Sequence, residues 1–92
     1  MTTCPVQALA RELAQVGLTI RTLLEAVTHA YEDSRGDQPP WDELPDHRKG
    51  FVMWTAHIHV CNLPVPTPDD QQPPMPPAFL GRLDHHVART RQ

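Results

Sequence analysis

Histidine and cysteine are the residues of this chain whose types and spacing could support chemistry. Six of the 92 residues are histidines, and His57 and Cys61 stand four positions apart. This spacing places both side chains on one face of a helix, and also on one face of a strand. A zinc site needs three or four ligands, and no Cys-x-x-Cys or His-x-x-x-His pair stands elsewhere to complete one. We therefore expect no metal site and no cofactor, with structural or surface roles for His57, His59 and Cys61.

Nucleophilic catalysis has few candidates. It requires a serine or cysteine, a histidine base and an acid that orients the base. Ser34 is the only serine, and it lacks the flanking glycines of a nucleophile elbow. Cys61 with His57 is the remaining pair, but apolar neighbours would raise the pKa of the thiol and leave it a poor nucleophile. We expect the protein not to be an enzyme.

Acidic side chains cluster in residues 32–46, where Arg35 is the only opposing cation. Their spacing does not match an EF-hand, which arranges oxygen ligands around a central glycine. The cluster is either a solvated loop with helix-capping acids or a surface that attracts a basic partner protein. Its members are Glu32, Asp33, Asp37, Asp42, Glu43 and Asp46.

The overall charge argues against nucleic-acid binding. The net charge is −3 and Lys49 is the only lysine, whereas phosphate neutralisation relies on clustered Lys and Arg. No apolar run approaches the roughly 20 residues that span a bilayer, and no signal-peptide pattern is visible. We expect a cytoplasmic protein with reduced Cys4 and Cys61, and with neither nucleic acid nor membrane as a partner.

Three segments have the apolar period of an amphipathic helix. Residues 5–16 begin with a proline at the first helical position and end before Gly17, and residues 19–34 begin with Thr19 as N-cap. Because a tight turn joins these two helices, we expect them to fold back on each other as a hairpin. Residues 78–90 form a third, shorter segment. The apolar stripes are Val6, Leu9, Leu13 and Val16; Ile20, Leu23, Leu24, Val27 and Tyr31; and Phe79, Leu80, Leu83 and Val87.

Residues 46–62 fit two structures. Phe51, Trp54, Ile58 and Cys61 recur at helical spacing, whereas the alternation of residues 54–60 also suits a strand. The segment has no internal turn signal and is long for a strand, so we predict a helix.

Residues 63–77 hold seven of the eleven prolines, which lack an amide donor and favour an extended, polyproline-like arm. At about 3.1 Å per residue the arm reaches roughly 45 Å, so the terminal helix could dock on its own chain or on a neighbour's. We favour a homodimer formed by such an exchange. The predicted fold is all-α, with a helical domain at 1–62, a linker at 63–77 and a C-terminal helix at 78–92.

Residues 31–49 place a tryptophan in a proline-rich loop. Trp41 is either a plug over a small core or one wall of a binding site. The segment resembles the RyR domain, the small helical module named after the ryanodine-receptor repeats and also seen as stand-alone phage and bacterial proteins. The residues that carry the resemblance are Tyr31, Gly36–Asp37, Gln38–Pro39, Trp41, Asp42–Glu43, Pro45 and Lys49.

The resemblance implies a binding module without catalysis, and in phages a small accessory protein. We therefore expect an interaction protein that binds and blocks a host protein with a basic surface, such as a host defence component. A second hypothesis is a small-ligand module in which Tyr31 and Trp41 stack on a ring such as a nucleotide base. The residues expected to bind are Tyr31, Asp37, Trp41, Asp42, Glu43 and Asp46.

Overall fold

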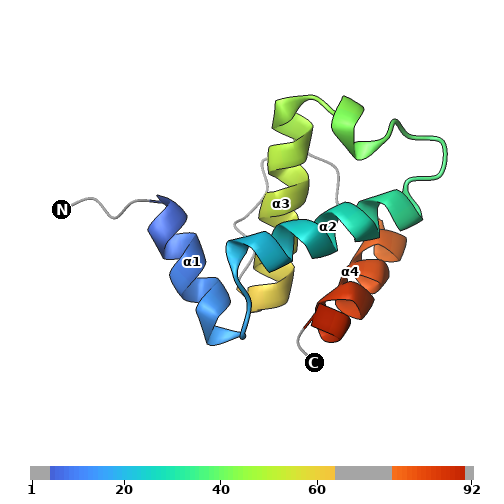
Figure 1. Ribbon diagram of the computed structural model, residues 1–92. Coiled ribbons are helices and arrows are strands. Elements are labelled where there is room, and N and C mark those ends of the chain that lie inside the picture. Colours follow the sequence, from blue (N-terminus) through green and yellow to red (C-terminus); the bar gives the residue numbers. More distant parts are fainter. Residues whose placement is uncertain (1–4, 64–75, 91–92) are drawn as a thin grey trace.

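Four α-helices and one short 3-10 helix form the described part of the chain, residues 5–63 and 76–90 of the computed structural model. The predicted all-α class is confirmed, and residues 46–61 are a helix rather than a strand. The Pro-rich segment at 64–75 lies outside the described residues, so its predicted extended structure stays a prediction. The elements are α1 (Pro5–Gln15), α2 (Ile20–Ser34), η1 (Trp41–Glu43), α3 (Asp46–Cys61) and α4 (Pro77–Thr90) (Figure 1).

Local signals set the helix ends. Gly17 follows α1 with φ +80°, a left-handed conformation that glycine adopts without a steric cost. Thr19 then caps α2: its side-chain oxygen accepts from the amide of Thr22, and the Thr22 side chain accepts from the amide of Thr19. This reciprocal capping satisfies two amides that would otherwise lack partners. Asn62 ends α3 in the left-handed region, with φ +56°.

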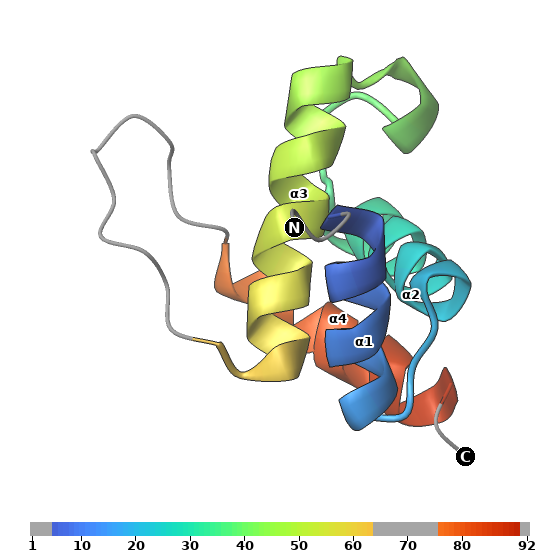
Figure 2. The same cartoon turned by 90° about the vertical axis from the view of Figure 1, so that its left-hand side faces the viewer.

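Helix α2 lies at the centre of the fold. It crosses α3 and α4, and its contact with α4 is the most extensive between any two helices of the described part (Figure 1). Helix α1 lies beside α3 and runs in the same direction (Figure 2). The sequence predicted that α1 would fold back onto α2. The two helices do join at a tight turn, but their contact is small, and α1 packs more extensively on α3. The reason is that α4 occupies the apolar side of α2.

A single apolar core joins all four helices. Leu13 of α1, Leu23 and Val27 of α2, and Leu83 of α4 are completely buried. Phe79, at the start of α4, is 2% exposed and is among the largest side chains in the core. The terminal helix is therefore a structural part of the domain, because its apolar stripe supplies core residues to α2.

Candidate functional site

The loop that carries Trp41 is anchored to the end of α2 by polar contacts. The Tyr31 hydroxyl donates to the Pro39 carbonyl at 2.7 Å. The two carboxylate oxygens of Glu32 accept from the Trp41 amide at 2.8 Å and from the Arg35 Nε at 3.1 Å. Glu32 therefore holds the loop in place, and Arg35 offsets its charge.

Trp41 packs as a plug. It contacts the edge of the apolar core, and its ring meets Tyr31 edge to face with centroids 5.6 Å apart. Lys49 Nζ lies 6.0 Å from the centroid of the Trp41 ring, at the outer limit of a cation–π contact. Burial raises the pKa of Tyr31 above its ordinary value, partly opposed by Arg48 and Arg35. Because Tyr31 is 4% exposed, it does not offer a ring face on which a ligand could stack in this arrangement.

The remaining acidic residues predicted to bind lie at the surface. Asp37, Asp42, Glu43 and Asp46 are all exposed, and no side-chain ion pair engages them within the described residues. They surround η1 and the first turn of α3, beside Trp41. These four predicted residues thus lie in one exposed stretch of the chain, residues 37–46, and no described side chain pairs with their charges.

One face of α3 that no other described element covers was not identified from the sequence. We call it the open face; it consists of the apolar Phe51 and Trp54, with the exposed His47 and Gly50 beside them at helical spacing. Phe51 and Trp54 were expected in the buried stripe of this segment, but Trp54 is 44% exposed and their ring centroids are 6.1 Å apart. The buried residues of α3 are Val52, Ala56 and Ile58, which are 1%, 0% and 8% exposed, so of the expected stripe only Ile58 is buried. The run of four apolar residues at 51–54 was the available signal, because such a run cannot face one side of a helix.

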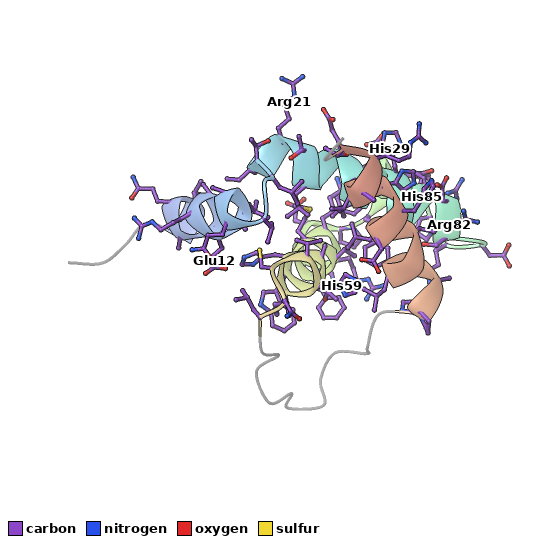
Figure 3. The ribbon with its side chains drawn as sticks, turned by 90° about the horizontal axis from the view of Figure 1, so that it is seen from below. Glu12, Arg21, His29, His59, Arg82 and His85 are labelled. Atoms are coloured by element: carbon purple, nitrogen blue, oxygen red, sulfur yellow. The ribbon has the colours of Figure 1, made fainter. Side chains whose placement is uncertain are left out.

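Three histidine–carboxylate contacts connect three different pairs of helices. His57 Nε2 lies 2.6 Å from Glu12 Oε2, which joins α3 to α1. His59 Nε2 lies 2.7 Å from Asp84 Oδ1, which joins α3 to α4. The third contact, between α4 and α2, places His86 Nε2 2.8 Å from Asp33 Oδ2. Figure 3 shows that Glu12 and His59 lie apart from each other and that His29 lies with His85 and Arg82 near α4.

The Asp33 contact predicts a dependence of stability on pH. Its hydrogen bond with His86 holds the pKa of Asp33 below the ordinary value of 3.8. Desolvation opposes this shift in the pKa, whereas the charges of His86, Arg82 and His29 add to it. A carboxyl group with a lowered pKa stabilises the fold above its unfolded pKa, and this contribution is lost as the pH falls through the folded value. We expect Asp33→Asn to melt below the wild type at about pH 6, and the difference to close below pH 3.8.

Melting curves of the two proteins over this range are the measurement, with Asp42→Asn as the control. Asp42 is also an exposed aspartate, but it has no such partner among the described side chains. Its substitution should change the melting temperature little at any pH. An Asp33→Asn difference that persists unchanged below the folded pKa of Asp33 would contradict the assignment.

Cys61 has the properties of a structural thiol rather than those of a nucleophile. It carries a free thiol and is half-buried. Burial raises the pKa of Cys61 above its ordinary value of 9.0, and the neighbouring Glu12 carboxylate raises it further. A nucleophilic cysteine needs the opposite shift, toward the thiolate at neutral pH.

Comparison with protein-family models, with curated proteins and with solved structures gave no match. The RyR resemblance therefore stays a prediction that depends on residues 31–49 and the helix after them. No helix in the described ranges is both long and apolar enough to cross a bilayer.

Proposed function

We propose that the protein is a non-enzymatic interaction module that binds a surface of a partner protein through the open face of α3. In line with the RyR resemblance, we place it in the cytoplasm as an accessory protein of phage type that blocks a host protein. The observation that carries the proposal is the exposure of Trp54 beside Phe51 on a helix whose opposite side is buried.

The open face lies on the side of α3 that also packs against α1. Trp54, His57 and Cys61 stand at i, i+3 and i+7, so they lie along one side of α3. Helix α1 covers the later part of this side, where Glu12 reaches His57 (Figure 2). Toward the start of α3, which α1 does not cover, this side is formed by Trp54 with Phe51 beside it.

Aromatic side chains on a rigid helix are suited to binding. Tryptophan is enriched among the residues that carry most of the energy of protein–protein interfaces, because it buries a large area with few rotatable bonds. Trp54 and Phe51 are held by a helix backbone and contact each other, so little side-chain freedom remains to be lost on association. The face therefore offers a preorganised apolar contact.

Gly50 offers a way to test this assignment. A Cβ at position 50 would meet no atom within 4 Å, so the described fold tolerates a larger side chain there. Such a side chain would project from α3 next to Phe51 and Trp54 and would obstruct a partner bound to the open face.

The charges beside the open face indicate the chemistry of the partner. Asp42 and Glu43 of η1 and Asp46 in the first turn of α3 are exposed next to it in the sequence. A matching surface would have an apolar pocket for Trp54 and basic side chains next to it, and such charge complementarity speeds encounter more than it adds affinity. We therefore expect binding to weaken as salt is raised.

The test substitutes the open face without disturbing the core. Trp54→Ala and Gly50→Gln are expected to fold as the wild type does and to lower affinity for the partner by about 30-fold or more, the loss typical of a central interface residue. Leu24→Ala and Gly81→Gln are the matched controls: Leu24 is 43% exposed, and a Cβ at Gly81 also meets no atom within 4 Å. Both controls should bind as the wild type does.

The five proteins would be used as baits in host lysate, with captured proteins quantified by mass spectrometry and affinities measured on the purified partner. A protein captured by the wild type and both controls, but depleted on both open-face variants, supports the proposal. Equal capture by all five baits would contradict it. In a parallel thermal-shift screen with nucleotides, stabilisation would favour the small-ligand hypothesis instead.

A further inference from the structure

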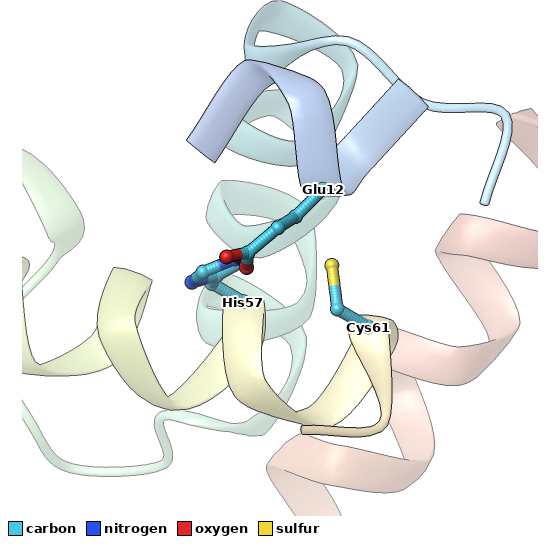
Figure 4. A group of neighbouring side chains, drawn as sticks. All are labelled: Glu12, His57 and Cys61. Atoms are coloured by element: carbon cyan, nitrogen blue, oxygen red, sulfur yellow. Dashed lines mark hydrogen bonds and ion pairs between the residues drawn. The ribbon is translucent and has the colours of Figure 1, made fainter. Parts of the chain in front are cut away.

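The strongest cluster of unassigned side chains lies between α1 and α3. Glu12, His57 and Cys61 each direct one ligand atom toward the others, and these atoms all lie within 4.8 Å of one another. Figure 4 shows the Glu12 carboxylate descending from α1 to the His57 ring, with the Cys61 sulfur on the same side of α3. It is the only group of three such residues at this spacing within residues 5–63 and 76–90.

The three side chains have the chemistry of zinc ligands. Zinc binds cysteine sulfur, histidine nitrogen and carboxylate oxygen, and four-coordinate sites often use three protein ligands and leave one position for water. Zinc bonds of about 2.0–2.3 Å place neighbouring ligand atoms of a tetrahedral site roughly 3.3–3.6 Å apart. The contact between His57 Nε2 and Glu12 Oε2, at 2.6 Å, is shorter than this. An ion entering between them would therefore replace the hydrogen that they share.

The surroundings allow the small movements that binding needs. His57 and Cys61 stand one helical turn apart on α3, so the backbone holds two ligands in place. Glu12 is the adjustable ligand, because its side chain is 37% exposed whereas that of His57 is 18% exposed. Rotation of the Glu12 side chain can open the pair, and the exposed side of the cluster leaves room for a water as fourth ligand.

We propose that Glu12, His57 and Cys61 form a binding site for a divalent transition metal ion, with zinc as the ion that best fits the three ligand types. The sequence did not predict this site, because only His57 and Cys61 are neighbours along the chain. The fold supplies Glu12 from 45 positions away. Because the ligands come from two helices, a bound ion would fix α1 against α3, and it would do so independently of any partner bound to the open face.

Cobalt(II) is the probe of choice, because it takes zinc sites and reports its ligands by absorption. The wild type, reduced and freed of metal, should bind one Co²⁺ per chain with a thiolate-to-cobalt charge-transfer band in the near ultraviolet. Added Zn²⁺ should displace the cobalt and abolish the band. Saturating Zn²⁺ should also raise the melting temperature by several degrees, because the assembled site binds the ion more tightly than the unfolded chain does.

Variants separate the ligands from their neighbours. Cys61→Ala should abolish the charge-transfer band and lower the affinity by about 100-fold or more, since even the loss of an outer-shell partner costs about 10- to 100-fold. Glu12→Gln retains an oxygen that can accept a hydrogen bond from His57 but is a poorer ligand, so it should weaken binding by at least about 10-fold. Cys4→Ser and His59→Gln are the controls and should leave binding unchanged. Circular dichroism verifies that each variant is folded.

The following outcomes would contradict the proposal. The wild type fails the test if it binds no Co²⁺ or if the bound ion shows no thiolate band. A band that survives Cys61→Ala, or that is lost in Cys4→Ser, would assign the sulfur ligand to a different site. Binding that is unaffected by Cys61→Ala but lost in His29→Gln would move the ion to the histidines near α4, where the His29 and His86 rings lie 5.5 Å apart.

Discussion

A chain that ends at Leu63 is expected to lose cooperative thermal unfolding. The truncation removes α4, which has the most extensive contact with α2 and supplies Phe79 and Leu83 to the core. Deleting one large buried side chain costs about 3–5 kcal/mol, and small domains are stable by only roughly 5–15 kcal/mol. The stabilising free energy lost with the whole helix therefore exceeds the stability of the domain. The truncation also exposes the apolar side of α2.

The measurement is a melting curve by circular dichroism, together with light scattering of both chains. Two point variants of the full chain grade the effect: Phe79→Ala should lower stability by about 3–5 kcal/mol, whereas Leu80→Ala, at a half-buried neighbour, should cost less. A shortened chain that melts cooperatively at the wild-type temperature would show that α4 is not needed. Light scattering also tests the predicted homodimer, since an exchanged α4 would make the same contacts with the α2 of a second chain.

Trp41→Ala is expected to destabilise the fold by about 3 kcal/mol, the lower end for a tryptophan, because the ring is only partly buried. The change removes the contact with Tyr31 and leaves a gap at the edge of the core. In a domain of this size the loss corresponds to a fall in melting temperature of more than about 10 °C. Chemical denaturation at neutral pH gives the free energy of unfolding directly.

Trp54→Ala is the matched control, since it removes the same side chain from a position that is 44% exposed. Trp54→Ala should lower the free energy of unfolding by no more than about 0.5 kcal/mol, the usual range for surface substitutions. The pair thus distinguishes a structural tryptophan from a binding one. If Trp41→Ala were as stable as the wild type but lost the partner, Trp41 would belong to a binding surface and the plug assignment would be wrong.

The helices themselves could be predicted from the sequence, because their signals are local. Gly17, Thr19 and the proline at position 5 fixed the ends of α1 and α2 to within a residue or so of the observed bounds. The ambiguous segment at 46–62 was correctly predicted from its length. Local signals do not specify which helices pair, however, and the contact between α2 and α4 depends on residues separated by the whole of α3.

The candidate sites, too, could be predicted only where their residues are neighbours in the sequence. Trp41 and the acidic residues near it were identified because they are neighbours in sequence. The role of Glu32 in anchoring the Trp41 amide was missed, because it requires α2 and η1 to be placed in space. Glu12 could not be identified at all, since a single glutamate in an amphipathic helix has no distinguishing neighbours.

The four helices are not packed equally well, and α1 is the one that should open locally. Among the side chains of α1 that the structure describes, Leu13 alone is completely buried, and α1 contacts α3 and, less extensively, α2. Segments with few buried contacts open without global unfolding. The amides of α1 should therefore exchange with solvent deuterium through detachment of this helix alone, whereas those of α2 and α4 exchange only when the whole domain unfolds. The protein thus contains a detachable helix on a stable three-helix unit, and detachment would extend the apolar surface of α3 past Trp54 to His57 and Cys61.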